Sequence, residues 1–231
     1  MTASLSPLIL ESLAAFGTCR IANAIEQLDV RLRNEGFSND QVQCRFPEMS
    51  PTVGYAVTLR VRSSNPPMRG GFYAEQTDWW DHLGQHPVPH VLVIQDLDRQ
   101  NGVGAFVGKV HASILRAMQC VGVVTNGAVR DLPAVKELGL QLFSGSVSVS
   151  HGYVHVVDVG APVEIAGMRI NPGDLLHGDR HGLVTIPTAI AAEIPPIAER
   201  LQKHEQEILD YCQSSAFNPA GLRKLLAAAA R

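Results

Sequence analysis

Cysteine is scarce in this chain, and the four cysteines at positions 19, 44, 120 and 212 lie far apart and form no CxxC pair. Structural zinc sites of the finger type need closely spaced cysteine pairs, and disulfide-stapled secreted domains need a dense cysteine framework. The sequence therefore predicts neither. Reduced thiols in the cytoplasm fit this cysteine usage best.

An excess of positive charge is also missing. The chain has 19 Lys and Arg residues against 22 Asp and Glu residues, which gives a formal net charge of -3. Proteins that grip nucleic acid through its phosphates present a face rich in Lys and Arg. We therefore expect no nucleic acid among the partners of this protein.

Long apolar runs are absent as well. A membrane-spanning helix needs about 20 mostly apolar residues, and Glu11 and Arg20 interrupt the apolar N-terminal stretch. That stretch also lacks the basic beginning of a secretory signal. We expect a cytoplasmic protein with no membrane partner. Its 45% hydrophobic and 18% charged residues are typical of a globular domain with a sizeable core.

Helix and strand patterns alternate in the first part of the chain. Ser6-Pro7 is typical of a helix start and Gly17 of its end. Residues 54–62 alternate as in a half-buried strand, whereas the apolar run 90–94 predicts a strand buried on both faces. The remaining expectations are a helix at 19–28, a glycine-rich loop at 102–108, a helix at 109–120, a strand at 121–124, a loop at 126–131 and a helix at 132–138. This order predicts an α/β fold with parallel crossovers.

The second part of the chain has a different pattern of apolar and turn-forming residues. Short apolar segments separated by Gly, Pro and Asn predict strands at 154–159, 163–170, 174–177 and 183–186. A long amphipathic helix is expected at 188–213, with a short one at 222–230. No Pro-rich, Ser-rich or charged linker divides the chain. We therefore predict a single domain over residues 1–231, with a C-terminal helical extension from about 188 to 231.

The loop from Gly102 to Gly108 resembles a dinucleotide-binding loop. It misses the GxGxxG spacing because Val107 takes the place of the third glycine, and the following strand ends at Asn126 with no acid for a ribose hydroxyl. A nicotinamide site is therefore disfavoured. The loop is either a tight turn before a helix or a small-anion site, formed by the N–H groups that begin the helix at residues 108–111.

Four histidines of the second part raise the question of zinc, at positions 151, 155, 177 and 181. Both pairs are spaced four apart, but they lie in predicted strands or turns, where that spacing separates side chains by roughly 13 Å. Ordinary polar histidines are therefore the better interpretation. Trp79-Trp80 lies in a predicted helix, and we expect these rings to pack in the core.

The segment from Asn126 to Asp131 follows a buried strand, where α/β folds gather ligand-binding groups. Arg130 supplies a planar fork for a carboxylate, and Asp131 supplies a hard oxygen for Mg²⁺ or a similar ion. On spacing alone, a structural ion pair between these neighbours is the simpler interpretation. Both stay open at this point.

A resemblance to known proteins bears on this choice. Gly108-Lys109, then twenty residues, then Arg130-Asp131 resembles the signature of the 4-hydroxy-4-methyl-2-oxoglutarate aldolases and of the regulators of ribonuclease activity A, which share one fold, here called RraA-like. The stretch PGDLLHGDRHGLVTIP at residues 172–187 resembles their common sheet motif. The likeness extends over most of the chain, from the second helix to the long C-terminal one.

The resemblance implies a swivelling β/β/α fold, assembled as a homotrimer or a hexamer with its site at a subunit boundary. It implies a substrate carboxylate bound by the backbone of Gly108, Lys109, Val110 and His111, with Arg130 reaching the same substrate. Asp131 is the implied ligand of a divalent metal, Mg²⁺ or Mn²⁺. Glu205 of a neighbouring subunit, with Glu207 as the next candidate, is implied to hold the metal's water shell.

The implied substrate is a small 2-oxo acid, and Arg130 and Asp131 are the implied catalytic residues. Cleavage of a 4-hydroxy-2-oxo acid and decarboxylation of oxaloacetate both leave a pyruvate enolate. A chelated divalent ion stabilises that charge as a Lewis acid, and a metal-bound water can act as the base on the 4-hydroxyl. One site can therefore perform both reactions.

Lys109 departs from the aldolase pattern, which has an acidic residue after the glycine. That acid holds waters on the metal, and a lysine cannot accept their hydrogen bonds. The regulator members also lack the acid; they bind a ribonuclease and need no catalysis. Two functions stay open, a metal-dependent lyase weakened by Lys109 and a non-catalytic regulator that binds a protein partner. A Schiff base formed by Lys109 has no other support in the sequence.

Overall fold

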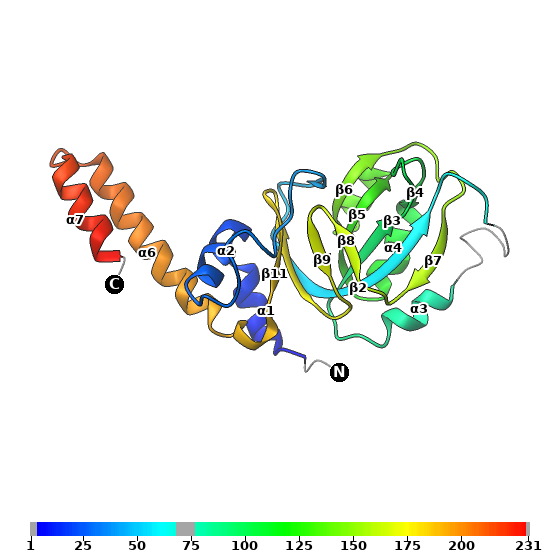
Figure 1. Cartoon of the computed structure of the whole chain (residues 1–231), viewed down its shortest axis with the longest axis horizontal. Helices are drawn as coiled ribbons and strands as arrows, with labels where there is room; N and C mark the ends of the chain where they lie inside the picture. The colour runs from blue at the N-terminus through cyan, green and yellow to red at the C-terminus, as the bar shows by residue number, and fades with distance from the viewer. Residues whose placement is uncertain (1–3, 68–76, 230–231) are drawn as a thin grey trace.

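A strongly curved β-sheet forms the body of the molecule (Figure 1). The computed structural model describes residues 4–67 and 77–229. Within them the sheet has nine strands in the order β1-β6-β5-β3-β2-β10-β11, with β4 paired to β5 and β7 paired to β2. The strands are β1 (Gln43–Cys44), β2 (Thr52–Arg62), β3 (His90–Asp96), β4 (Ala105–Val107), β5 (Cys120–Val129), β6 (Gln141–Val147), β7 (His155–Val159), β10 (Leu175–Asp179) and β11 (Gly182–Ile186).

The middle of this sheet is parallel, as the alternation of strand and helix patterns predicted. β2, β3, β5 and β6 pair in parallel, and β1, β7, β10 and β11 add antiparallel strands around them. β2 lies inside the sheet, where it pairs with β3, β10 and β7, and the expectation that it is half-buried is wrong. Ala56, Val57 and Thr58 in succession are fully buried. The reason is that apolar layers cover both faces of β2.

Three helices cover one face of the sheet, and a β-hairpin covers the other. The helices are α3 (Asp78–Leu83), α4 (Lys109–Ala117) and α5 (Leu132–Glu137), and the hairpin is β8 (Val163–Ile165) with β9 (Met168–Ile170). Trp79 of α3 is 2% exposed and packs against Phe106 at a ring distance of 5.7 Å. This confirms the expectation that the tryptophan packs in the core. It also places α3 against the start of α4.

The N-terminal helices α1 (Pro7–Ala14) and α2 (Thr18–Glu26) pack on a separate apolar cluster with β10, β11 and residues 190–201 of the C-terminal segment. Gly17 begins α2 without a capping side chain. Asp179 of β10 replaces it, because its carboxylate accepts a 2.8 Å hydrogen bond from the backbone N–H of Thr18. No single helix among the described residues is long and apolar enough to cross a membrane; α1 and α2, bent by 108°, pass that test together on length and composition only.

The C-terminal segment forms a helical arm that leaves the body of the molecule (Figure 1). It consists of the 3₁₀ turn η2 (Thr188–Ile190), α6 (Ile194–Gln213) and α7 (Pro219–Ala229). The single helix expected over residues 188–213 is therefore interrupted. Prolines follow Ile194 directly, and proline is favoured in the first turn of a helix rather than in its interior. Ile194 and Ala198 anchor the arm in the core, and α6 packs mainly on α2, α7 and α1.

Two boundaries near the glycine-rich loop differ from the sequence-based expectation. β5 continues past residue 124 to Val129, so Asn126 and Gly127 lie in a strand and not in a loop. The loop at 102–108 contains β4, because Ala105 pairs with Ala128 of β5. Both changes come from strand pairing with distant residues. The ladder to β6 shifts register between Thr125 and Ala128, which carries β5 through the Asn-Gly pair.

Candidate functional site

The parallel pairing of β4 with β5 brings the two halves of the motif together. α4 begins directly after β4, and Arg130 and Asp131 follow directly after β5. The backbone N–H of Arg130 donates a 3.0 Å hydrogen bond to the carbonyl of Val107. The start of α4 and the Arg-Asp pair therefore share one edge of the sheet, although twenty residues separate them in the sequence.

Asp131 is held in an unusual conformation that directs its carboxylate toward α4. Its φ of 57° lies in the left-handed region, which non-glycine residues rarely adopt and which costs on the order of 1 kcal/mol. It occupies the N-cap position of α5 but makes no capping hydrogen bond there. Instead Oδ2 accepts a 2.9 Å hydrogen bond from the backbone N–H of Lys109. The side chain is 46% exposed, so the carboxylate is open to a ligand.

Gly108 leaves the space that the Arg-Asp pair occupies. A Cβ atom at this position would lie 2.7 Å from Asp131 Oδ2 and 2.9 Å from Arg130 Nε, closer than real contacts allow. The backbone there is extended, so the close approach and not the conformation requires glycine. The Nε of Arg130 in turn lies 3.9 Å from Asp131 Oδ2. The three residues form one packed unit.

The first turn of α4 adds backbone N–H groups to this unit. Gly108 is the N-cap and contributes no side chain, and the N–H groups of a first turn have no acceptor within the helix. Together with the helix dipole they favour an anion. Lys109 is exposed, and Val110 is 73% exposed. Arg130, 30% exposed, brings a guanidinium group to the same place.

The side chain of His111 packs against Phe106, which lies just before the start of α4. Its ring stacks on Phe106 with centroids 4.9 Å apart, and its Nδ1 lies 2.8 Å from the carbonyl oxygen of Phe106. Burial lowers the pKa of His111, and the charge of Arg130 lowers it further. The hydrogen bond to Phe106 raises it, but the net shift is downward. The imidazole is therefore neutral at neutral pH, with the Nδ1–H donating to Phe106. In this structure the His111 side chain braces the loop.

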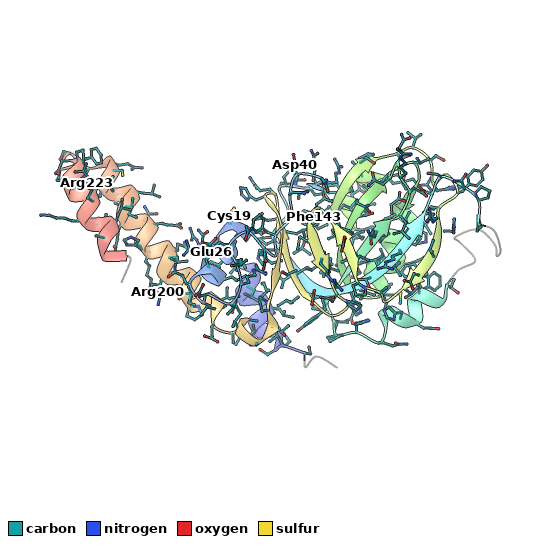
Figure 2. The ribbon with its side chains drawn as sticks, in the orientation of Figure 1. Cys19, Glu26, Asp40, Phe143, Arg200 and Arg223 are labelled. Carbon is teal, nitrogen blue, oxygen red and sulfur yellow. The ribbon has the colours of Figure 1, made fainter. Side chains whose placement is uncertain are left out.

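Glu205 does not lie near Asp131 within one chain. It is on α6, where its Oε2 lies 2.5 Å from Nη2 of Arg20 on α2. Figure 2 shows Arg200 of α6 and Arg223 of α7 well away from Phe143 in the sheet. The neighbouring candidate Glu207 lies 3.5 Å from His204 of the same helix. Within one chain the two carboxylates therefore pair with Arg20 and His204 and not with Arg130.

The remaining candidate residues lie elsewhere and do not converge. His177 is buried in β10, where its Nδ1 lies 3.0 Å from the hydroxyl of Thr18, and His155 lies on β7. Among the described residues, no group of three or more His, Cys, Asp and Glu side chains could hold a metal ion. Asp131 therefore belongs to no ready-made metal centre within the described ranges.

Asp96, which no sequence motif had pointed to, ties the glycine-rich loop to the sheet. Its carboxylate accepts hydrogen bonds from the backbone N–H groups of Gly102 at 2.9 Å and Asp98 at 3.0 Å. The side chain of Asn126 bonds the backbone N–H and carbonyl of Asp96, so it serves the fold and not a ligand. Burial raises the pKa of Asp96. The sequence pattern that could have identified Asp96 is an acidic residue placed between an apolar run and a glycine-rich loop.

Comparison with known proteins agrees with this architecture. Residues 18–185 match the model of the RraA-like family, described as Aldolase/RraA. A protein of Halalkalibacterium halodurans named "Putative 4-hydroxy-4-methyl-2-oxoglutarate aldolase" is 26% identical over 103 residues, which are 44% of this chain and 49% of that protein. Protein DlpA of Legionella pneumophila is 30% identical over 40% of this chain and 18% of its own length. The chain thus spans about half or less of these curated relatives.

Solved structures show the same fold. A protein from Pseudomonas syringae pv. tomato superposes with a TM-score of 0.72 at 21% identity, covering 99% of this chain and 97% of the other. Streptomyces coelicolor RraAS2, described as an unusual member of the RNase ES inhibitor RraA protein family, gives 0.68 at 20% identity, covering 93% and 100%. These likenesses confirm the expected RraA-like α/β fold with its C-terminal helix. The family match covers well over half of the residues, and this chain therefore belongs to the RraA-like family.

Proposed function

We propose that this protein is a divalent-metal-dependent lyase of 2-oxo acids. The reactions are cleavage of a 4-hydroxy-2-oxo acid and decarboxylation of oxaloacetate, both through a pyruvate enolate. The observation that carries this is the carboxylate of Asp131, held in a left-handed conformation against the N-terminus of α4 and beside Arg130. Strain at a non-glycine residue is found mostly where function requires a position. The name of the H. halodurans relative points to the same class of reaction.

The substrate carboxylate is assigned to the start of α4 and to Arg130. The backbone N–H of Lys109 already bonds Asp131, so the N–H groups that follow, beginning with Val110, are the ones offered to an anion. The guanidinium of Arg130 provides a planar fork for the same carboxylate. The neutral ring of His111 holds the loop through its hydrogen bond to the carbonyl oxygen of Phe106.

The donor set fits a hard divalent ion. Mg²⁺ keeps several waters and is often bound through only one or two carboxylates, and the half-exposed Asp131 provides one. Its Oδ2 is engaged by Lys109, and a carboxylate has further lone pairs to give. When bound, Mg²⁺ or Mn²⁺ supplies a Lewis acid that stabilises the charge developing on the 2-oxo group. Asp131 would hold the metal ion next to the carboxylate site at Arg130.

A neighbouring subunit is needed to complete this site. Among the described residues Asp131 belongs to no group of three or more His, Cys, Asp and Glu side chains that could hold a metal ion, and Glu205 lies on the arm formed by α6 and α7, which projects from the body (Figure 1). We therefore assign Glu205 of a neighbouring subunit to the water shell of the metal, in a trimer or a hexamer. In this arrangement Arg20 holds the carboxylate of Glu205 in place.

The deciding experiment measures pyruvate release from oxaloacetate, coupled to NADH oxidation by lactate dehydrogenase. Oxaloacetate also decarboxylates with free metal ions, so each rate is corrected by a blank that contains the metal without protein. Activity should vanish in EDTA and return with Mg²⁺ or Mn²⁺. Asp131→Ala should abolish it, whereas Glu137→Ala, a nearby exposed acid on α5, should not. Chelator-resistant activity, or activity that survives Asp131→Ala, would contradict the proposal.

A regulator that binds a ribonuclease is the second candidate function. The observation that favours it is Lys109, which is exposed at the position where the aldolases place an acid. RraAS2 is described as belonging to a family of RNase ES inhibitors, and this chain has its fold. Inhibition of a purified endoribonuclease by this protein, without any metal-dependent pyruvate release, would establish the regulator and reject the lyase.

A further inference from the structure

Two histidines on the outer side of the molecule face each other closely. His82 lies in the last turn of α3, and His86 follows four residues later, with its backbone N–H bonded to Leu83 at 3.2 Å. This spacing places both side chains on one face of the helical turn. Their Nε2 atoms lie 3.2 Å apart, and the rings are nearly perpendicular, with centroids 4.7 Å apart.

That distance matches two ligands of one metal ion. Zinc binds imidazole nitrogen at about 2.0–2.1 Å, so two such nitrogens 3.2 Å apart subtend an angle of about 100° at the metal, close to tetrahedral. The pairs at 151/155 and 177/181 do not share this feature, because they lie in strands and turns. His82 and His86 have the same spacing on a helical turn, which makes the two rings converge.

In this structure the two Nε2 atoms share one hydrogen bond, so a metal ion that binds both nitrogens must displace the shared proton. Each ring is only partly buried. Burial lowers the pKa of His82, and burial together with the charge of His82 lowers the pKa of His86. Both rings are therefore neutral near pH 7, which is the metal-binding form. Gly160 faces His82, and a Cβ there would lie 2.9 Å from its Nε2, so a side chain at position 160 would crowd the nitrogen.

We propose that His82 and His86 form a binding site for a late first-row transition-metal ion, through both Nε2 atoms. Within the described residues no third His, Cys, Asp or Glu joins the pair, so water completes the coordination. Imidazole ligands favour Zn²⁺, Ni²⁺ and Cu²⁺ over Mg²⁺, and Cu²⁺ should bind most tightly. The site is separate from Asp131, and it stands whether or not the proposed lyase function is correct.

Such an ion would fix the end of α3. This helix carries Trp79, whose ring lies 5.7 Å from Phe106 and 6.2 Å from His111, the residues that brace the start of α4. A metal bound only to the folded protein raises its stability by mass action. The pair is therefore expected to make the thermal midpoint depend on the transition-metal concentration, through the helix that supports the candidate site.

The test uses untagged full-length protein stripped with EDTA. Cu²⁺ electron spin-echo envelope modulation should show two imidazole nitrogens, and Ni²⁺ calorimetry should show one ion per chain that is lost or weakened at least tenfold in His82→Gln and in His86→Gln. His155→Gln, which removes another accessible imidazole, is the control and should bind this ion as the wild type does.

Two results would overturn the proposal. One is a wild-type Cu²⁺ spectrum with a single imidazole or with none, and this measurement needs no variant to fold. The other is Ni²⁺ affinity in His86→Gln within twofold of the wild type. Loss of Ni²⁺ binding in Asp131→Ala but not in the histidine variants would also overturn it, because it would place the ion at the Arg-Asp site.

Discussion

The backbone N–H of Lys109 and the carboxylate of Asp131 are joined by a 2.9 Å hydrogen bond across 22 positions of the sequence. This contact connects the proposed metal ligand to the helix terminus that is proposed to bind the substrate carboxylate. A hydrogen bond to a charged acceptor is stronger than a neutral one. A change on either side of the contact is therefore expected to alter metal and anion binding together.

Gly108→Ala should damage the site with little loss of fold. The new Cβ would lie under 3.0 Å from Asp131 and Arg130, so one of these side chains must move. Overpacking of this kind costs about 1–3 kcal/mol, and here it falls on two partly exposed side chains. We expect oxalate affinity, measured by calorimetry, to fall at least tenfold. Gly84→Ala is the control, because its Cβ would lie 3.5 Å from the nearest atom. Unchanged oxalate binding in Gly108→Ala would show that the pair does not form the site.

Arg130→Lys tests the carboxylate fork. Lysine keeps the charge but loses the planar pair of donors, so oxalate and pyruvate should bind more weakly. Oxalate should raise the thermal midpoint of the wild type by mass action and that of the variant much less. Equal protection of both proteins would mean that Arg130 is structural, paired with Asp131 at 3.9 Å and nothing more.

The sequence was sufficient for some of these relationships and not for others. The motif around Gly108 and Arg130 predicted the helix start and the Arg-Asp pair, because short-range patterns encode a buried strand followed by a turn. The left-handed conformation of Asp131 has no such pattern, since aspartate adopts it only where surrounding contacts compensate the strain. β4 was missed for a related reason: three residues form a strand there only because Ala128 is beside them.

Contacts between side chains that lie far apart in the sequence could not be predicted either. Glu205 was expected to face a metal, and its contact with Arg20, 185 positions away, has no signal in a single sequence. The capping of α2 by Asp179 is another example, because the N-cap position itself is Gly17. Both contacts depend on how α2 packs against α6 and β10.

Asp179→Ala should destabilise the protein in a pH-dependent way. Burial raises the pKa of the Asp179 carboxyl. The hydrogen bonds from the backbone N–H groups of His181 and Thr18 lower it by more, so the pKa lies below its usual value. The stabilisation is therefore complete above the unfolded pKa of about 3.9 and is lost as the pH falls through the lower folded value. Losing the cap should cost about 1–2 kcal/mol near pH 7.

Urea unfolding of the wild type and Asp179→Ala at several pH values measures this difference. The gap between the two free energies of unfolding should shrink below about pH 4, where the carboxylate of Asp179 takes up a proton. A gap that stays the same down to pH 3 would show that the charge of Asp179 contributes nothing and that only packing was lost.

Subunit complementation tests the shared site. Light scattering should give a trimer, or a multiple of it, of the 24.9 kDa chain. Asp131→Ala and Glu205→Gln should each be inactive alone. When equal amounts of the two variants form mixed rings, roughly a quarter of the sites combine an intact Asp131 with an intact Glu205 from the neighbouring subunit. The mixture should therefore regain roughly a quarter of the wild-type activity. Glu199→Gln, an exposed acid on the same helix, should remain active alone. A monomer, or a mixture without activity, would remove the shared site.

Lys109→Glu is the sharpest test of the lyase against the regulator. The exposed ammonium of Lys109 adds positive charge beside the proposed metal. A charge pair at roughly 4 Å and an effective dielectric of ~20 is worth about 4 kcal/mol before solvent screening, whereas a tenfold change in affinity needs only about 1.4 kcal/mol. We therefore expect weak Mg²⁺ binding and slow pyruvate release in the wild type. The substitution keeps the backbone N–H that bonds Asp131, so the carboxylate should stay in place.

Lys109→Glu should raise both Mg²⁺ affinity and chelator-sensitive pyruvate release at least tenfold, with Lys224→Glu on α7 as the charge-matched control that changes neither. The glutamate can accept hydrogen bonds from metal-bound waters, which lysine cannot. Strong wild-type activity that the substitution destroys would instead make Lys109 a ligand of the substrate carboxylate. Absence of activity in both proteins, with ribonuclease inhibition that Lys109→Glu weakens, would assign the exposed start of α4 to a protein partner, because a regulator needs the surface of this site and not its metal.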